Sequence, residues 1–99
     1  MREYKTLFLN ERDSVAVALS DIPAEAEVIV KADGKKFHVK ILEPIRFGHK
    51  FAVRAIPQGE DIIKYGEVIG AAVAPIDAGE HVHVHNLEGK RGRGDKIVQ

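Results

Sequence analysis

Histidines at alternating positions are the strongest candidates for a metal site in this chain. Three of the five histidines, His81, His83 and His85, follow one another at two-residue intervals. A β-strand would place these imidazoles on one face and Val82 and Val84 on the other. Neighbouring histidines of the row would lie about 7 Å apart at Cα, so two of them could reach one divalent ion at about 2.0–2.1 Å per nitrogen. A strand could therefore offer two of the three histidines to one metal, with the remaining ligands supplied from elsewhere.

The same row has a second interpretation without chemistry. The histidines could form a solvated strand face, with the two valines packed beneath it. That interpretation predicts imidazoles that titrate near pH 6.5 and a fold that metal ions do not stabilise. Cysteine, the other common metal ligand, is absent from the chain. Spacing alone leaves the two interpretations open.

A second candidate is the dipeptide His49-Lys50, which follows Gly48. Glycine permits a tight backbone, so His49 and Lys50 could be presented from a loop edge between Phe47 and Phe51. An imidazole beside an ammonium group suits acid/base chemistry or the binding of an anion. The dipeptide by itself does not choose between a functional and a structural role.

Length and charge limit what the chain can do alone. Its 99 residues predict one domain with a modest core, too small to enclose a full active site. Fifteen basic and fifteen acidic residues balance, so no strong field favours nucleic acid or an anionic membrane surface. No apolar run approaches the roughly 20 residues that span a bilayer. The first residues lack the apolar core of a signal peptide, so a cytoplasmic protein is expected.

Short β-rich runs separated by turns predict an all-β fold. The clearest signal is a hairpin, in which segments 27–31 and 36–41 flank Asp33-Gly34, a pair that accepts positive φ. His38 lies in this hairpin and is expected to be an exposed strand residue rather than a ligand. No helix of ordinary length is convincing anywhere in the chain.

Three segments share the pattern of a strand, a turn and a strand. Segments 22–28, 56–62 and 76–82 each place an aliphatic residue six positions before another. They are interpreted as repeated corners rather than a solenoid, because their separations are unequal. Between the last two corners, Lys64 and Tyr65 could face a pocket, although a strand tyrosine is also common as half-buried packing.

The end of the chain is rich in glycine and charged residues. This composition predicts a flexible basic tail over residues 89–99, after a β domain over residues 1–88. A docking arm, or the remnant of a linker to another domain, is the alternative.

Four motifs in this order resemble the amino-terminal domain of the altronate and galactarate dehydratase family. They are Gly48-His49-Lys50-Phe51-Ala52, Ile62-Ile63-Lys64-Tyr65-Gly66, Ile69-Gly70 and the histidine segment 79–86. That domain belongs to the SAF group of small β-clip modules. The resemblance therefore implies a single SAF-like β-clip domain.

The resemblance also implies a function and partners. Members of this family remove water from sugar acids to give 2-keto-3-deoxy acids, usually with a divalent metal, for which Fe²⁺ is expected and Mn²⁺ is the alternative. The small domain normally precedes a large catalytic region, and relatives similar to sulfolactate sulfo-lyase divide the two parts into separate subunits. A large catalytic dehydratase subunit and a sugar acid are therefore the expected partners, with self-association left open.

Site residues are carried over from the matching motifs. The expected metal ligands are His81, His83 and His85. The expected catalytic residues are His49, Lys50 and His83. The expected substrate-binding residues are Lys64, Tyr65 and Asn86. The alternatives are a non-catalytic module that binds a carbohydrate acid or a protein, the small subunit of a sulfolactate sulfo-lyase, and a purely structural domain.

Overall fold

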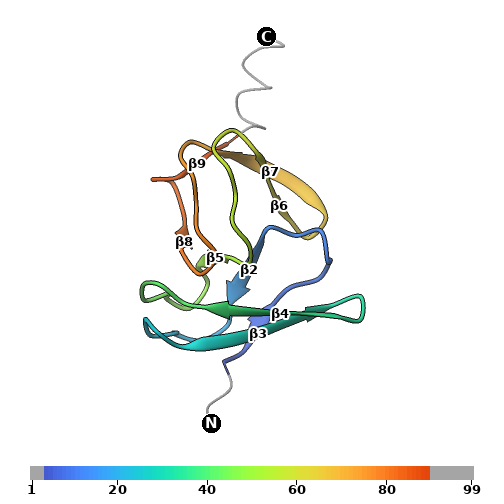
Figure 1. The fold of residues 1–99 in the computed structure, drawn as a ribbon, viewed down its shortest axis with the longest axis vertical. Coiled ribbons are helices and arrows are strands. Elements are labelled where there is room, and N and C mark those ends of the chain that lie inside the picture. The colour runs from blue at the N-terminus through green and yellow to red at the C-terminus, as the bar shows by residue number, and fades with distance from the viewer. Residues whose placement is uncertain (1–3, 90–99) are drawn as a thin grey trace.

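A computed structural model describes residues 4–89, which form β-strands joined by turns (Figure 1). The predicted all-β class is confirmed, and residues 4–89 contain no helix long and apolar enough to cross a membrane. Apart from Gly89, the tail predicted over residues 89–99 lies outside the described residues. The strands are β1 (Thr6–Leu7), β2 (Val15–Ala18), β3 (Glu27–Ala32), β4 (Lys35–Lys40), β5 (Lys50–Ala52), β6 (Asp61–Lys64), β7 (Glu67–Ala72), β8 (His81–Val82) and β9 (Leu87–Glu88).

The described strands form three antiparallel sheets. The central sheet has the order β1-β2-β5-β8, while β3 pairs with β4 and β7 lies between β6 and β9. In Figure 1 the β3-β4 hairpin lies below the central sheet and the β6-β7 hairpin lies above it. The central sheet is therefore the layer that the two hairpins share.

Strand alternation gives the central sheet two apolar faces. Along β2, Ala16 and Ala18 belong to the core between the central sheet and the β3-β4 hairpin, whereas Val15 belongs to the core that contains residues of β6 and β7. Along β5, Phe51 and Ala52 divide in the same way. Since successive strand residues face opposite sides, burial on both sides fixes the register of this sheet. The buried strands β2 and β5 therefore hold the residues at their ends in fixed positions.

Four corners of the same geometry connect the sheets, one more than the sequence predicted. In each, an isoleucine forms an isolated β-bridge, and the residue three positions later has positive φ. The bridges pair Ile22 with Ile45 and Ile56 with Ile76. The corner at Ile45 was missed because Phe51, six positions later, is aromatic rather than aliphatic. The chain therefore repeats one unit twice, consisting of a corner, a hairpin and a second corner.

Each corner ends in a β-bulge. At the corner that begins at Ile45, the N–H of Gly48 donates to the oxygen of Ala18 at 2.7 Å, and the N–H of Ala18 donates to the oxygen of His49 at 2.9 Å. Two consecutive residues thus oppose one residue of β2, with Gly48 at φ 85°. This is the bulge in which a left-handed first residue bends the strand and redirects the following side chain.

The two hairpins also turn alike. The predicted turn Asp33-Gly34 is confirmed, with φ values of 54° and 77° between paired β3 and β4. Tyr65 and Gly66 repeat it between β6 and β7, with φ values of 55° and 79°. The second turn was not predicted as a hairpin, because tyrosine rarely occupies a left-handed position. His38 is exposed on β4, as expected.

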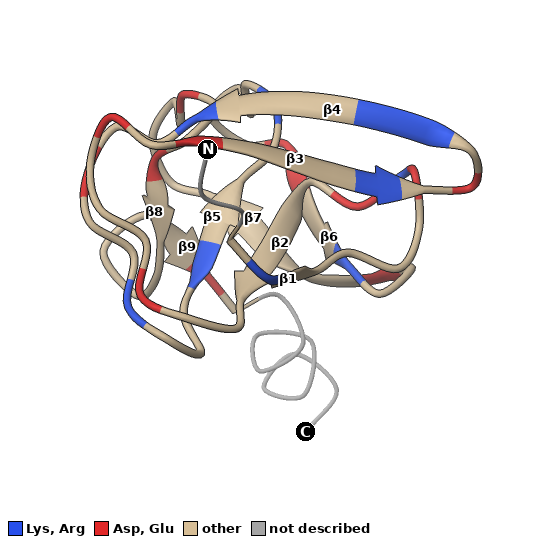
Figure 2. Cartoon of the chain, turned by 90° about the horizontal axis from the view of Figure 1, so that it is seen from below, with Lys and Arg blue, Asp and Glu red and all other residues tan. Residues whose placement is uncertain are grey.

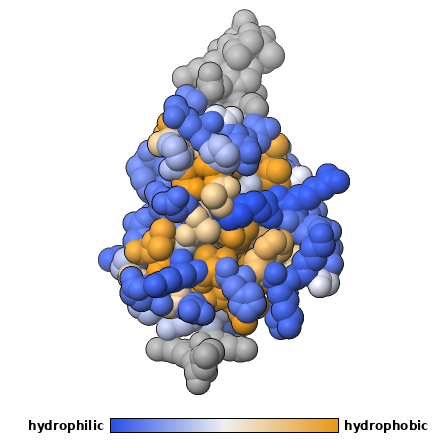
Figure 3. Space-filling model, in the orientation of Figure 1, coloured by the Kyte–Doolittle hydropathy of each residue, from blue (hydrophilic) through white to orange (hydrophobic). Residues whose placement is uncertain are grey.

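Charged and apolar groups are distributed unevenly over this frame. Figure 2 shows acidic and basic residues interspersed along the chain, with lysines on the β3-β4 hairpin. On the face drawn in Figure 3, apolar residues remain visible between polar ones. Eight large apolar side chains of the described residues are exposed. Three of them are Leu42, Phe47 and Val84.

Candidate functional site

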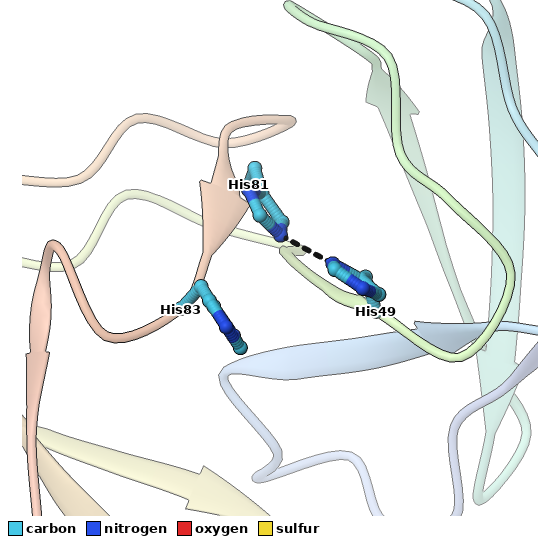
Figure 4. A group of neighbouring side chains, drawn as sticks. All are labelled: His49, His81 and His83. Carbon is cyan, nitrogen blue, oxygen red and sulfur yellow. Dashed lines mark hydrogen bonds between the residues drawn. The ribbon is translucent and has the colours of Figure 1, made fainter.

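The second corner of each repeat carries the histidines that meet in the fold. The corner at Ile45 leads through His49 into β5, and the corner at Ile76 leads directly into His81 of β8. Because β5 and β8 are antiparallel neighbours, with Phe51 opposite His81, the two corners end side by side. Figure 4 shows His49 and His81 pointing toward each other, with His83 beside them. The fold thus collects imidazoles that lie 32 residues apart in the chain.

The imidazoles of His49, His81 and His83 form one compact group. Nδ1 of His49 lies 2.9 Å from Nε2 of His81, and the two rings stack with centroids 5.0 Å apart. The His83 ring stacks on His49 at 5.3 Å and on His81 at 5.5 Å. The short contact needs one nitrogen to donate and the other to accept, so the two rings share a single proton there. At least one of these imidazoles is therefore neutral while the contact is made.

The predicted strand over the histidine row is shorter in the structure. β8 ends at Val82, which is buried, and the chain then turns, so that Val84 is 80% exposed rather than packed beneath the row. His83 and His85 are exposed, and the His85 ring is tilted at 5.5 Å from that of His81. The group of three candidate ligands consists of His49, His81 and His83, so His49 stands in it where the sequence predicted His85. Metal binding by His85 stays a prediction.

Asn86 fixes the turn that follows β8. Its Oδ1 accepts the N–H of His83 at 2.9 Å, and its Nδ2 donates to the oxygen of His81 at 2.8 Å. The residue is 4% exposed, and its amide already serves the backbone, so the structure gives it the task of positioning His83. The predicted hydrogen bond from Asn86 to a substrate hydroxyl stays untested.

Glu43 is a carboxylate beside the cluster that sequence reasoning did not identify. Its Oε2 accepts the backbone N–H of His81 at 3.1 Å across 38 residues of chain. No local pattern marks it, because the contact depends on the packing of the corner at Ile76 against the end of β4. Glu43 brings an acidic oxygen to a group that otherwise contains imidazoles.

Electrostatics keep His81 toward its neutral form. Burial lowers the pKa of His81 below its ordinary value of 6.5, and the neighbouring His49 lowers it further, while Glu43 acts in the opposite direction. A neutral imidazole has a free lone pair on one nitrogen, which is the form that binds a metal or accepts a proton. The site is therefore suited to either role near neutral pH.

Lys50 does not join its neighbour His49. It pairs across the sheet with Val17 and Val82, on the face opposite Phe51. Burial lowers the pKa of Lys50, and the nearby charge of Lys64 lowers it further. The lysines therefore form a separate basic region, on the face of the sheet opposite the imidazoles.

Lys64 and Tyr65 lie at an open cavity beside the turn of the β6-β7 hairpin. This cavity has a volume of about 380 Å³, and its lining consists of Lys64, Tyr65, Glu67, Val68 and Ile69. The Nζ of Lys64 lies 5.1 Å from the centre of the Tyr65 ring. The predicted pocket position of both residues is therefore seen, whereas their contact with a substrate stays a prediction.

The donor set of the cluster fits a divalent metal. Nitrogens that bind one ion tetrahedrally at 2.0–2.1 Å lie about 3.3 Å apart. The ligand nitrogens of His49, His81 and His83 all lie within 4.8 Å of one another, which is close enough for the three residues to be candidate ligands of one ion. Three protein ligands with one exposed side are typical of a catalytic metal site, which keeps a position open.

Comparisons with known proteins point to one group of lyases. The family model described as the altronate/galactarate dehydratase SAF domain matches residues 4–90. Altronate dehydratase of Escherichia coli (strain K12) is 47% identical over 74 residues, which cover 75% of this chain and 14% of that enzyme. Altronate dehydratase of Bacillus subtilis (strain 168) is 35% identical over 85 residues, covering 81% of this chain and 15% of the enzyme.

A shorter relative matches over nearly its whole length. The alpha subunit of (2R)-sulfolactate sulfo-lyase from Paracoccus pantotrophus is 40% identical over 63 residues, which cover 64% of this chain and 94% of the subunit. The chain thus spans a small part of the two altronate dehydratases but almost all of a subunit of a multi-subunit enzyme.

Proposed function

This chain belongs to the altronate/galactarate dehydratase SAF-domain family, and we propose that it is the small subunit or amino-terminal domain of a metal-dependent sugar-acid dehydratase. Together with a large catalytic part, it removes water from an altronate-type or galactarate-type acid to give a 2-keto-3-deoxy acid. The observation that supports this proposal most strongly is the convergence of His49, His81 and His83 at the exposed edge of a domain too small to enclose a substrate.

The three imidazoles are proposed to hold the metal. Fe²⁺ suits imidazole ligands, and Mn²⁺ is the alternative. When bound, the ion supplies Lewis-acid stabilisation of the negative charge that develops beside the substrate carboxylate. Asn86 holds the turn that carries His83, and Glu43 holds the backbone of His81.

Proton transfer and substrate binding are assigned to the remaining side chains. Dehydration takes the proton next to the carboxylate and returns a proton to the departing hydroxyl group. Lys50, whose pKa burial lowers, is shifted toward the range in which an amine can accept a proton. Lys64 and Tyr65 at their cavity are suited to hold an anionic group of the substrate. The cytoplasmic location expected from the sequence stays a prediction.

Reconstituted activity tests this proposal. The chain is mixed with the large lyase chain of the same organism and Fe²⁺ under anaerobic conditions, and 2-keto acid formation from altronate and galactarate is measured. We expect His49→Ala and His83→Ala to lower kcat/KM at least about 100-fold, as the loss of a principal catalytic group does. His38→Ala, which changes an exposed histidine on β4, is the matched control and keeps full activity. Full activity of His49→Ala would refute the proposed role of the cluster.

Sulfolactate cleavage is the second candidate. It is favoured by the match to nearly the whole sulfo-lyase alpha subunit of Paracoccus pantotrophus. The same reconstituted mixture is given (2R)-sulfolactate, and sulfite release is measured. Sulfite formation without turnover of the sugar acids would replace the dehydratase assignment. Ligand binding without turnover of any of these acids would favour the non-catalytic binding module instead.

A further inference from the structure

Exposed apolar residues lie next to the histidines of the cluster in the chain. Phe47 is 66% exposed two positions before His49, and Val84 is 80% exposed directly after His83. These are the two most exposed of the large apolar side chains in residues 4–89. An exposed phenylalanine next to a polar site is unusual for a surface that meets only water, since scattered apolar groups are ordinary but clustered ones mark interaction sites.

A third apolar side chain extends this surface along the corner at Ile76. Leu42 is 46% exposed, and its N–H donates to the oxygen of Gly79 at 3.0 Å. It also directly precedes Glu43, the carboxylate that contacts the backbone of His81. Leu42, Phe47 and Val84 therefore lie within two residues of Glu43, His49 and His83 along three separate chain segments, and we call these three residues the apolar rim.

Fixed turns present the two most exposed members of the rim. The N–H of Phe47 donates to Oδ1 of Asp21 at 2.8 Å, and the next residue opens the bulge against β2. The turn that carries Val84 is closed by the buried side chain of Asn86. A backbone that is already ordered adds little loop-ordering cost when a partner covers it. The rim is therefore prepared for binding before any partner arrives.

The size of the relatives and the openness of the site identify the occupant. The matched region is 14% of the Escherichia coli altronate dehydratase, so most of that enzyme lies outside it. In this chain His83 is exposed, and two of the three imidazoles are only half-buried. We infer that the apolar rim docks onto the large catalytic part of the lyase, so that the interface closes over the histidine cluster. This inference rests on the proposed function and adds to it the surface through which the partner binds.

Affinity for the large chain tests the docking surface. The large lyase chain of the same organism is immobilised, and the Kd of this chain is measured by biolayer interferometry. The variant Phe47→Ser/Val84→Ser is compared with Leu9→Ser/Ile29→Ser, whose side chains are 57% and 48% exposed and lie outside both the cluster and the cavity at Lys64. We expect the rim variant to raise Kd at least about tenfold, because aromatic anchors dominate interfaces. A smaller rise, or an equal rise in the control, overturns the inference.

Two further outcomes are distinguishable. The docking test measures affinity rather than turnover. If His49→Ala keeps full activity while the rim variant binds the large chain with a tenfold higher Kd, the histidine role is refuted and the docking surface is supported. Loss of activity in His49→Ala with an unchanged Kd for the rim variant would refute the docking surface alone. If sedimentation shows that the isolated chain dimerises through the rim while Kd for the large chain does not change, the rim serves self-association and the inference is overturned. Circular dichroism and thermal melting confirm that both double variants are folded.

Discussion

The first and second corners of the two repeats share a backbone but differ in what they carry. The corners at Ile22 and Ile56 lead into hairpins, and their bulges continue with Ala26 and Glu60. The corners at Ile45 and Ile76 lead into β5 and β8, which are neighbours in the central sheet. The imidazoles thus gather where the repeat brings two equivalent corners together.

The glycines of the corners at Ile45 and Ile76 have the same backbone conformation but different surroundings. Gly48 and Gly79 have φ values of 85° and 89°. A Cβ at Gly79 would overlap the carbonyl oxygen of Lys40, whereas a Cβ at Gly48 meets no described heavy atom within 4 Å. Close packing against the end of β4 therefore distinguishes the corner at Ile76, which also receives the contact from Glu43.

Alanine substitution should separate these two glycines. We expect Gly79→Ala to lower the free energy of unfolding by about 3 kcal/mol or more, because the backbone of β4 must move. We expect Gly48→Ala to cost about 1–2 kcal/mol, since it adds only left-handed strain. Urea denaturation of both variants measures the difference. Equal costs would show that the two corners are packed alike.

The pH dependence of stability should reveal the environment of His81. Its pKa in the folded chain lies below its ordinary value of 6.5, chiefly because of burial and then because of His49. As pH falls through 6.5, the unfolded chain binds a proton that the folded chain does not, so stability is lost until the folded pKa is passed. In metal-free protein, we expect His81→Gln to lose less stability than the wild type between about pH 7.5 and 5.5. Parallel stability curves from urea titrations would contradict this assignment.

The smallest effect is expected at a corner that has no chemistry. Glu25 has φ 74°, where the equivalent residue of the second repeat is Gly59 with φ 87°. We expect Glu25→Gly to stabilise the chain by about 0.5–1 kcal/mol, since it relieves left-handed strain. The ion pair lost with Lys40 is exposed and contributes little. Thermal unfolding measures the gain, and Gly59→Ala, which should destabilise, is the matched control; a loss of stability in Glu25→Gly would contradict the expectation.

Local patterns predicted the elements, whereas the site depended on contacts that only the fold creates. The hairpin around Asp33-Gly34 was predictable because its turn residues demand positive φ. The predicted extent of the strand over the histidine row was wrong. Alternating valine and histidine favour a strand, but Asn86 closes a turn there by accepting the N–H of His83. The grouping of His49 with His81 follows from β5 pairing with β8, and no local spacing encodes it.

The same limit explains the missed contributions of Glu43 and of the corner at Ile45. Glu43 reaches His81 across 38 residues, so its role is visible only when the corner at Ile76 packs against the end of β4. The corner at Ile45 lacked the second aliphatic residue that marked the others, although Gly48 signalled a tight backbone. Backbone geometry repeats more faithfully here than sequence does.

Metal binding by matched histidine variants tests the central claim, that the site is built from two corners rather than from one row. Co²⁺ serves as a visible probe and Fe²⁺ is titrated anaerobically, with the wild type, His49→Ala and His85→Ala compared in the complex with the large lyase chain. We expect one ion per chain in the wild type and in His85→Ala, and at least about tenfold weaker binding in His49→Ala, because that variant lacks one ligand. Weak binding in His85→Ala with unchanged binding in His49→Ala would contradict it and restore the alternating row as the site.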